Sequence, residues 1–258
     1  MKKTLLIIDS AQRVRGTSTD FLYSINYYNL SDVNAFRVNK ITVPYSFYNL
    51  KAQTFTISQG GPTININFPA GSYSANTLAQ KLSSLINASL FGATITINFL
   101  ADQNKFEFIM DFGTITINFL YDNSVLGNFA NYNLSYQLGI SSPTALANPP
   151  NFANYTSPLV ASLSATSNLY LASPNLNLYE VSIFNKVRAN IIQSIPVNVN
   201  SYNFIIWENS QETIFKLNDK SIGDLNFQLL DDYNNVVDLN GLNMIIELQL
   251  YSSESSAL

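Results

Sequence analysis

Short runs in which apolar and polar residues alternate are the feature that most constrains this fold. Examples are Phe36–Pro44, Thr54–Ser58, Thr63–Phe68 and Ala93–Leu100, and turn-forming residues follow each of them. Alternation with a period of two places the apolar side chains on one face of a strand. About ten or more such runs occur at a spacing of roughly 8 to 12 residues, which is typical of an antiparallel β-sandwich. We therefore expect an all-β fold.

One segment departs from this alternation and predicts a short amphipathic helix at about residues 74–87. Leu78, Leu82, Leu85 and Ile86 recur at helical spacing and form one apolar stripe, and Ser74 is a suitable N-cap. A single amphipathic helix must bury its stripe, and in this chain the available partner is a sheet. We expect the helix to lie in a connection of an antiparallel jelly-roll sandwich, the architecture that fits this strand number and chain length.

The length of 258 residues is compatible with one large all-β domain or two small ones. We expect residues 1–20 to form an extended N-terminal arm, because Ser10–Asp20 is polar and lacks periodicity. Residues 21–251 are expected to form a single jelly roll, and residues 252–258 a polar tail. Within the jelly roll, residues from about 122 to 167 are rich in Asn, Ser, Ala and Pro, which predicts an irregular excursion or insertion.

The chain contains an internal repeat of one strand-like segment. Thr94–Leu100 and Thr114–Leu120 are identical, both reading TITINFL. Solenoids and propellers need three or more copies at a fixed period, so two copies are interpreted as two adjacent strands with the same inward and outward pattern. The segment is uncharged and has high β-propensity, so it would promote aggregation if either copy lay at an exposed sheet edge.

The composition favours a subunit of an assembly. Only 12% of the residues are charged, about half the usual share, whereas 47% are hydrophobic. Copies with few surface charges repel one another weakly. The net charge of −4 and the pI near 4.7 argue against specific nucleic-acid binding, which needs a basic stripe.

Two apolar patterns in the sequence bear on localisation. No window approaches 18 uncharged apolar residues, so no membrane span is expected. The short apolar run Leu5–Ile8 is stopped by Asp9 and lacks a cleavage site, so we interpret it as a strand and not as a secretory signal peptide.

The residue inventory excludes most catalytic chemistry. The chain has 0 His and 0 Cys, which removes the commonest general base, thiolate chemistry and the usual zinc ligands. Carboxylate chemistry and Ser-Lys catalysis remain, and a carboxylate glycosidase would have to draw on scattered acids. These acids are Glu107, Asp111, Glu180, Glu208, Glu212 and Glu247. We interpret them as solvated or turn residues and expect no enzyme activity, no catalytic residue and no cofactor.

A second acidic cluster could be mistaken for a calcium loop. Asp231, Asp232, Asn234, Asn235 and Asp238 lack the spacing of an EF-hand, which needs a Gly at position 6 and a Glu at position 12. Asp and Asn are ordinary residues in a turn between two strands. No metal-ligating residue is therefore predicted.

Several motifs occur in a fixed order along nearly the whole chain. They are Ile8-Asp-Ser10, Gly16-Thr-Ser-Thr-Asp-Phe21, Val43-Pro44, Phe47-Tyr-Asn-Leu50, Pro69-Ala-Gly-Ser-Tyr-Ser74, Leu138-Gly-Ile140, Ser194-Ile-Pro-Val197 and a hairpin over Leu230–Gly241. This order resembles the minor capsid or penton proteins of virophages, polinton-like viruses and related large DNA viruses.

The resemblance implies a structural viral capsid protein built on a single jelly roll, with the helix capping one end of the sandwich. Such a penton forms the pentameric fivefold vertices of an icosahedral capsid. Its expected partners are four further copies, which complete a homopentamer, and the double-jelly-roll major capsid protein. The expected location is the capsid vertex of the virion, assembled inside the host cell. The N-terminal arm and the excursion at about 122–167 are the segments expected to make these contacts.

An alternative function comes from the residues themselves. A sandwich with 15 Tyr could be a carbohydrate-binding or adhesion module, because aromatic side chains stack against sugars. The two functions are distinguished by oligomeric state and by glycan binding.

Overall fold

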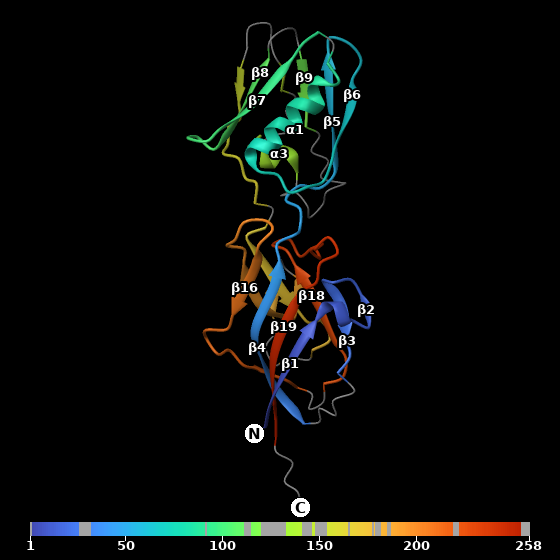
Figure 1. Ribbon diagram of the computed structural model, residues 1–258, viewed down its shortest axis with the longest axis vertical. Coiled ribbons are helices and arrows are strands. Elements are labelled where there is room, and N and C mark those ends of the chain that lie inside the picture. Colours follow the sequence, from blue (N-terminus) through green and yellow to red (C-terminus); the bar gives the residue numbers. More distant parts are fainter. Residues whose placement is uncertain are drawn as a thin grey trace, which may run out of the picture. The chain divides into compact units, whose positions relative to one another are not determined.

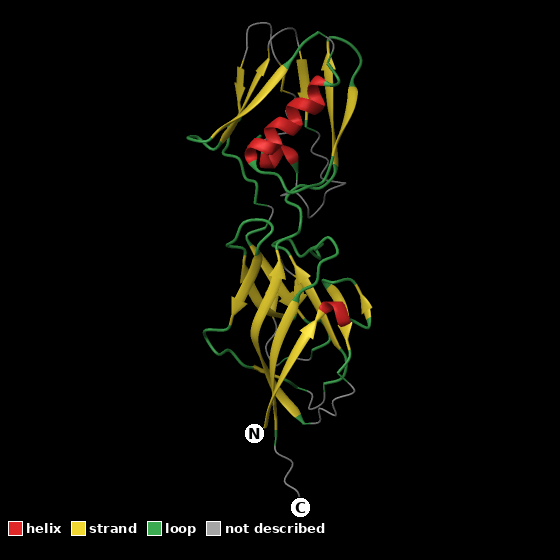
Figure 2. Ribbon diagram, in the orientation of Figure 1, coloured by secondary structure: helices red, strands yellow, loops and turns green. Residues whose placement is uncertain are grey.

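The computed structural model describes residues 2–25, 32–90, 92–110, 115–119, 133–140, 146–147, 154–164, 166–176, 178, 182–184, 187–218 and 222–253 (Figures 1 and 2). The chain forms two compact units. Unit 1 comprises Met1–Phe47 and Thr166–Leu258, and unit 2 comprises Tyr48–Ala165. Each unit has its own cluster of buried apolar side chains. This division corrects the expectation of a single jelly roll over residues 21–251.

Unit 1 contains two antiparallel sheets that enclose one core. The first sheet has the order β1 (Lys2–Asp9), β19 (Ile245–Ser252), β4 (Val33–Pro44), β16 (Phe204–Glu208), and β17 (Phe215–Lys216) also pairs with β4. The second has the order β15 (Ile191–Pro196), β12 (Asn168–Ala172), β18 (Leu225–Leu230), β3 (Asp20–Tyr23), β2 (Arg15–Gly16). A short hairpin joins β13 (Ser182–Phe184) to β14 (Val187–Ala189). Inward residues such as Ile8, Phe21 and Phe227 meet in the core.

The strand pairing of unit 1 is that of a jelly roll. Its eight principal strands in chain order are β1, β3, β4, β12, β15, β16, β18 and β19. The first pairs with the eighth, the second with the seventh, the third with the sixth and the fourth with the fifth, all antiparallel. A long hairpin rolled around a core gives this nesting. The predicted all-β jelly-roll class is therefore confirmed for unit 1.

The segment expected to be an extended arm belongs to this jelly roll. Strand β1 pairs with β19 along all 8 of its residues, and its Leu6 and Ile8 are buried. The polar stretch that follows contains a short 3-10 helix η1 (Ser10–Gln12) and turns back as the hairpin β2–β3. Gly16 is required at this hairpin, because its φ is +96° and a Cβ there would overlap the carbonyl oxygen of Asp20. The expectation of an arm over residues 1–20 is corrected accordingly.

Unit 2 interrupts the jelly roll between β4 and β12. It has one sheet with the order β10 (Leu146–Ala147), β9 (Ile115–Asn118), β5 (Gln53–Gln59), β6 (Ile64–Phe68), and another with the order β11 (Asn154–Thr156), β8 (Lys105–Met110), β7 (Ile95–Leu100). Helices α1 (Ala75–Asn87) and α3 (Leu134–Gln137) belong to the same unit (Figure 1). Side chains from α1, α3 and both sheets form its core.

The predicted amphipathic helix is present as α1. Ser74 is its N-cap: the Thr77 backbone amide donates to the Ser74 Oγ at 3.2 Å, and the Ser74 amide donates to the Thr77 Oγ1 at 2.9 Å. This reciprocal pair is a capping box made with Thr at N3. Leu78 and Leu82 are fully buried. The helix packs on β7 and β6 inside unit 2, and not on the jelly roll as the resemblance led us to expect.

The two TITINFL segments do not pair with each other. One provides β7, which pairs with β8, and the other provides β9, which pairs with β5 and β10. The prediction of two adjacent strands was therefore wrong, because long-range pairing separates two identical sequences.

Helix α1 covers the edge of the sheet at β7. The Ile95 amide donates to the Asn87 Oδ1 at 2.7 Å, and the Asn87 Nδ2 donates to the Ile95 carbonyl at 2.9 Å. The Ile97 amide donates to the Ser83 Oγ at 2.9 Å. These side chains occupy backbone groups that would otherwise offer a template to another strand.

The excursion expected at about 122–167 is described only in part. Residues 133–140, 146–147 and 154–164 form α3, β10, β11 and connecting turns of unit 2, whereas 120–132, 141–145 and 148–153 lie outside the described residues. The interruption of the jelly roll starts much earlier than expected, at Tyr48. Of the predicted tail, residues 252 and 253 are described and Ser252 is the last residue of β19.

Candidate assembly surface

The outer face of the sheet β1-β19-β4-β16 carries large apolar side chains. We call this set the edge patch and define it by its residues and exposed fractions: Leu5 52%, Ile7 57%, Phe204 61% and Ile206 56%. Their neighbours Leu6, Ile8 and Ile205 point to the core and are buried. Solvated faces of antiparallel sheets are normally polar. The exposed apolar set is therefore a candidate contact surface.

The edge patch lies on the two outermost strands of its sheet. Leu5 and Ile7 are on β1, and Phe204 and Ile206 are on β16. Between them the outer face carries charged residues, because Lys40 on β4 lies opposite Glu247 on β19 and Glu208 on β16, and it also carries the exposed Ile245 on β19. The Lys40 Nζ is 3.1 Å from the Glu208 Oε1. This exposed ion pair contributes little stability, but it places the Glu208 carboxylate at the rim of the sheet.

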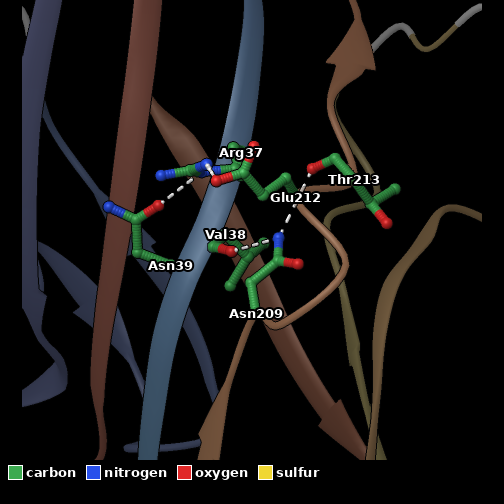
Figure 3. A network of polar contacts seen from close by, with 6 residues as sticks. All are labelled: Arg37, Val38, Asn39, Asn209, Glu212 and Thr213. Atoms are coloured by element: carbon green, nitrogen blue, oxygen red, sulfur yellow. Dashed lines mark hydrogen bonds and ion pairs between the residues drawn. The ribbon is translucent and has the colours of Figure 1, made fainter.

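A polar network fixes the loop that follows β16 (Figure 3). The Asn209 Nδ2 donates to the Val38 carbonyl at 2.8 Å and to the Thr213 carbonyl at 3.4 Å. The Arg37 Nε donates to the Asn39 Oδ1 at 2.8 Å, and an Arg37 guanidinium nitrogen is 3.5 Å from the Glu212 Oε1. These contacts hold the loop against β4, so β16 ends at a defined position.

The acidic turn at residues 231–235 has a structural role. The Asp231 Oδ1 accepts from the amides of Tyr233 and Asn235 at 2.8 and 2.9 Å. The Asp232 Oδ2 accepts from the Ser167 amide at 2.6 Å, which ties the turn to the segment where the chain re-enters unit 1. Burial and the adjacent Asp232 carboxylate both raise the pKa of Tyr170, whose hydroxyl donates to the Asp232 Oδ1 at 3.3 Å. The turn interpretation is confirmed.

The scattered acids that the structure describes belong to different units. Glu107 lies on β8 of unit 2, whereas Glu208, Glu212 and Glu247 lie on or beside the outer face of unit 1. Asp111 and Glu180 lie outside the described residues. Among the residues that are described, no group of three or more acids could hold a metal ion. In the same part of the chain, no helix is long and apolar enough to cross a membrane.

Comparisons with known proteins give one informative similarity. No protein-family model matches the chain, and no curated protein matches its sequence. The structure is similar to the crystal structure of the selenomethionine-labelled mavirus penton protein, with a TM-score of 0.51 and 12% identity over 98% of this chain and 100% of that chain. The chain shares the fold of that protein.

A second solved structure is far less similar. The D2–D3 domains of the flagellar cap protein FliD from Escherichia coli align over 88% of this chain and 100% of that chain, with a TM-score of 0.22 and 14% identity. The shared fold rests on the first similarity, which extends over both units of this chain.

Reasoning from sequence identified only half of the edge patch. It assigned subunit contacts to residues 1–20, which include Leu5 and Ile7, and to about 122–167, but not to Phe204 and Ile206 on β16. One signal was available. Leu5-Leu-Ile-Ile8 and Phe204-Ile-Ile206 are continuous apolar runs, so they place apolar side chains on both faces of a strand.

Proposed function

We propose that this chain is a structural viral capsid protein, a penton that forms the pentameric fivefold vertices of an icosahedral capsid. The observation that carries the proposal is the similarity to the mavirus penton protein over 98% of this chain and 100% of that one. A match confined to unit 1 would have supported only a jelly roll. The aligned length includes the inserted unit 2 as well, so both units take part in the similarity.

Composition and surface support the same function. A chain with 12% charged residues and an exposed edge patch is suited to permanent contact with other subunits. The proposed partners are four further copies and the double-jelly-roll major capsid protein. Contacts that repeat head to tail around an axis close into a ring when the rotation per subunit fits. The proposed location is the capsid vertex, with assembly inside the host cell and without a secretory signal. No enzymatic step is part of this function.

Native mass spectrometry of the purified full-length chain tests the oligomer. The expected species has five times the subunit mass of 28.7 kDa, and it should persist on dilution. If the chain is monomeric alone, co-expression with the major capsid protein from the same genome should recruit it to particles. A chain that is monomeric alone and absent from those particles would refute the proposal.

The carbohydrate-binding alternative stays a prediction of the sequence. A glycan array with the purified chain tests it. Saturable binding that is lost on replacement of one exposed tyrosine, such as Tyr202→Ala, would favour it over the penton function.

A further inference from the structure

Within the described residues, the outer edge of β1 offers backbone groups that pair with no other strand. The Ser10 amide donates to the Met244 carbonyl at 3.0 Å, which places Ser10 and Met244 at a hydrogen-bonded position of the β1·β19 ladder. Along an antiparallel pair, hydrogen-bonded positions alternate with positions whose backbone groups point away from the partner strand. The amides and carbonyls of Lys3, Leu5 and Ile7 therefore point away from β19. In the described part of the chain, β1 is the last strand of its sheet.

The opposite edge of the same sheet has the same property. The Tyr45 amide donates to the Asn203 carbonyl at 2.8 Å, and the Asn209 amide donates to the Asn39 carbonyl at 2.9 Å. These two bonds show that the backbone amides and carbonyls of the odd-numbered residues of β16 point toward β4. The backbone groups of Phe204, Ile206 and Glu208 thus point outward, and within the described residues β16 pairs only with β4.

These two edges differ from the covered edge in unit 2. There, Asn87 and Ser83 of α1 occupy the backbone groups of β7. Proteins usually block long edges with such side chains, with charges or with proline. The edges of the jelly-roll sheet carry, besides the charges of Lys3 and Glu208, the large apolar side chains of the edge patch, which are 52% to 61% exposed.

We propose that β1 of one copy adds to β16 of the next copy as an antiparallel strand, so that the jelly-roll sheets join across the subunit boundary. In one register, each of the outward-pointing residues of β1 lies opposite an outward-pointing residue of β16. Lys3 lies opposite Glu208, Leu5 opposite Ile206 and Ile7 opposite Phe204, which gives one ion pair and two apolar pairs. All of these residues also have outward backbone groups, so the same register makes the hydrogen bonds of strand addition.

The strand directions allow this contact to repeat. Strands β1, β19, β4 and β16 are successively antiparallel, so β16 runs opposite to β1. A copy related by rotation can therefore place its β1 antiparallel to β16 of the first copy, so that strand directions keep alternating across the subunit boundary. The contact joins two different surfaces, and such heterologous contacts generate rings. This inference rests on the proposed penton function and identifies the strands that make its subunit contact.

A cysteine pair tests the register directly, because the chain has 0 Cys. Opposite residues of an antiparallel pair have Cα atoms about 5.5 Å apart, within the range of a disulfide. Oxidation of Leu5→Cys/Ile206→Cys should give covalent oligomers of up to five subunits on a non-reducing gel. The control Leu5→Cys/Ile245→Cys, with the second cysteine on β19 and away from the edge, should give no such ladder.

The single variant Leu5→Cys distinguishes this contact from a twofold one. It should stay monomeric on the gel, whereas covalent dimers would show that β1 pairs with its own copy and would overturn the proposal. A pentamer seen by native mass spectrometry without cross-linking of the pair would also overturn it and leave the penton function standing. Absence of a pentamer both in the purified chain and in particles assembled with the major capsid protein would count against both.

Charge reversal provides a second, independent measurement. Lys3→Glu and Glu208→Lys should each raise the concentration at which half of the subunits dissociate by about fivefold or more, because each places like charges opposite each other. The double variant should recover most of the loss. Lys2→Glu has the same charge change one position away and serves as the control. Equal effects of Lys2→Glu and Lys3→Glu, or no recovery in the double variant, would contradict the register.

Discussion

Replacing Leu82 with alanine should destabilise unit 2 strongly. Leu82 is fully buried in α1 and belongs to the core of this unit. The substitution removes three carbon atoms, which corresponds to about 2.4 kcal/mol at roughly 0.8 kcal/mol per buried group. The cavity left behind adds to this transfer term, so the expected loss is about 3 to 4 kcal/mol.

Leu85→Ala is the matched control for Leu82→Ala. It makes the same chemical change in the same helix, but Leu85 is only partly buried, so we expect about half the loss. Urea denaturation followed by far-UV circular dichroism measures both values. Hydrogen exchange should locate the effect, with faster exchange in β7 and β8 and unchanged rates in β4 and β19. A loss below about 1 kcal/mol for Leu82→Ala, or equal losses for both variants, would refute the assigned packing of α1.

Three further predictions concern the helix cap, the covered edge and alkaline pH. Ser74→Ala should lower the free energy of unfolding by about 1 kcal/mol, because the Thr77 amide loses its acceptor. The control Ser84→Ala, on the exposed side of α1, should change the free energy of unfolding little. Thermal denaturation compares the two variants. Asn87→Ala uncovers the amide and carbonyl of Ile95, so light scattering during incubation should detect faster aggregation than wild type, and an unchanged rate would contradict edge protection. Burial raises the pKa of Tyr45 above its ordinary value of 10.0, so the unfolded chain releases this proton first as pH rises. The contribution of the protonated Tyr45 to the free energy of unfolding is therefore present below pH 10 and falls as pH rises above it. Tyr45→Phe should flatten the loss of stability that denaturation measures between pH 9 and 11.

The parts of the fold that sequence could predict are those set by local pattern. Leu78, Leu82 and Ile86 are spaced for a helix, and Ser74 precedes them, so α1 was predicted within one residue of its observed start. Alternating strands likewise indicated an all-β jelly roll. These signals depend on neighbouring residues only, and they survive in the folded structure.

The division into two units could not be predicted in the same way. Strands β5 to β9 have the same alternation as the strands of the jelly roll, so their pattern does not reveal which core they join. Pairing between distant segments decides this, as the two identical TITINFL strands show by entering different sheets. The edge patch depends on the same information, because Leu5 and Phe204 become edge residues only when the sheet order is known.

A cryo-electron microscopy map of particles assembled with the major capsid protein tests the central claim most directly. The account predicts five copies of this chain around each fivefold axis, with β1 of each copy beside β16 of its neighbour. Density for this chain at positions other than the fivefold vertices, or particles that close without it, would contradict the account.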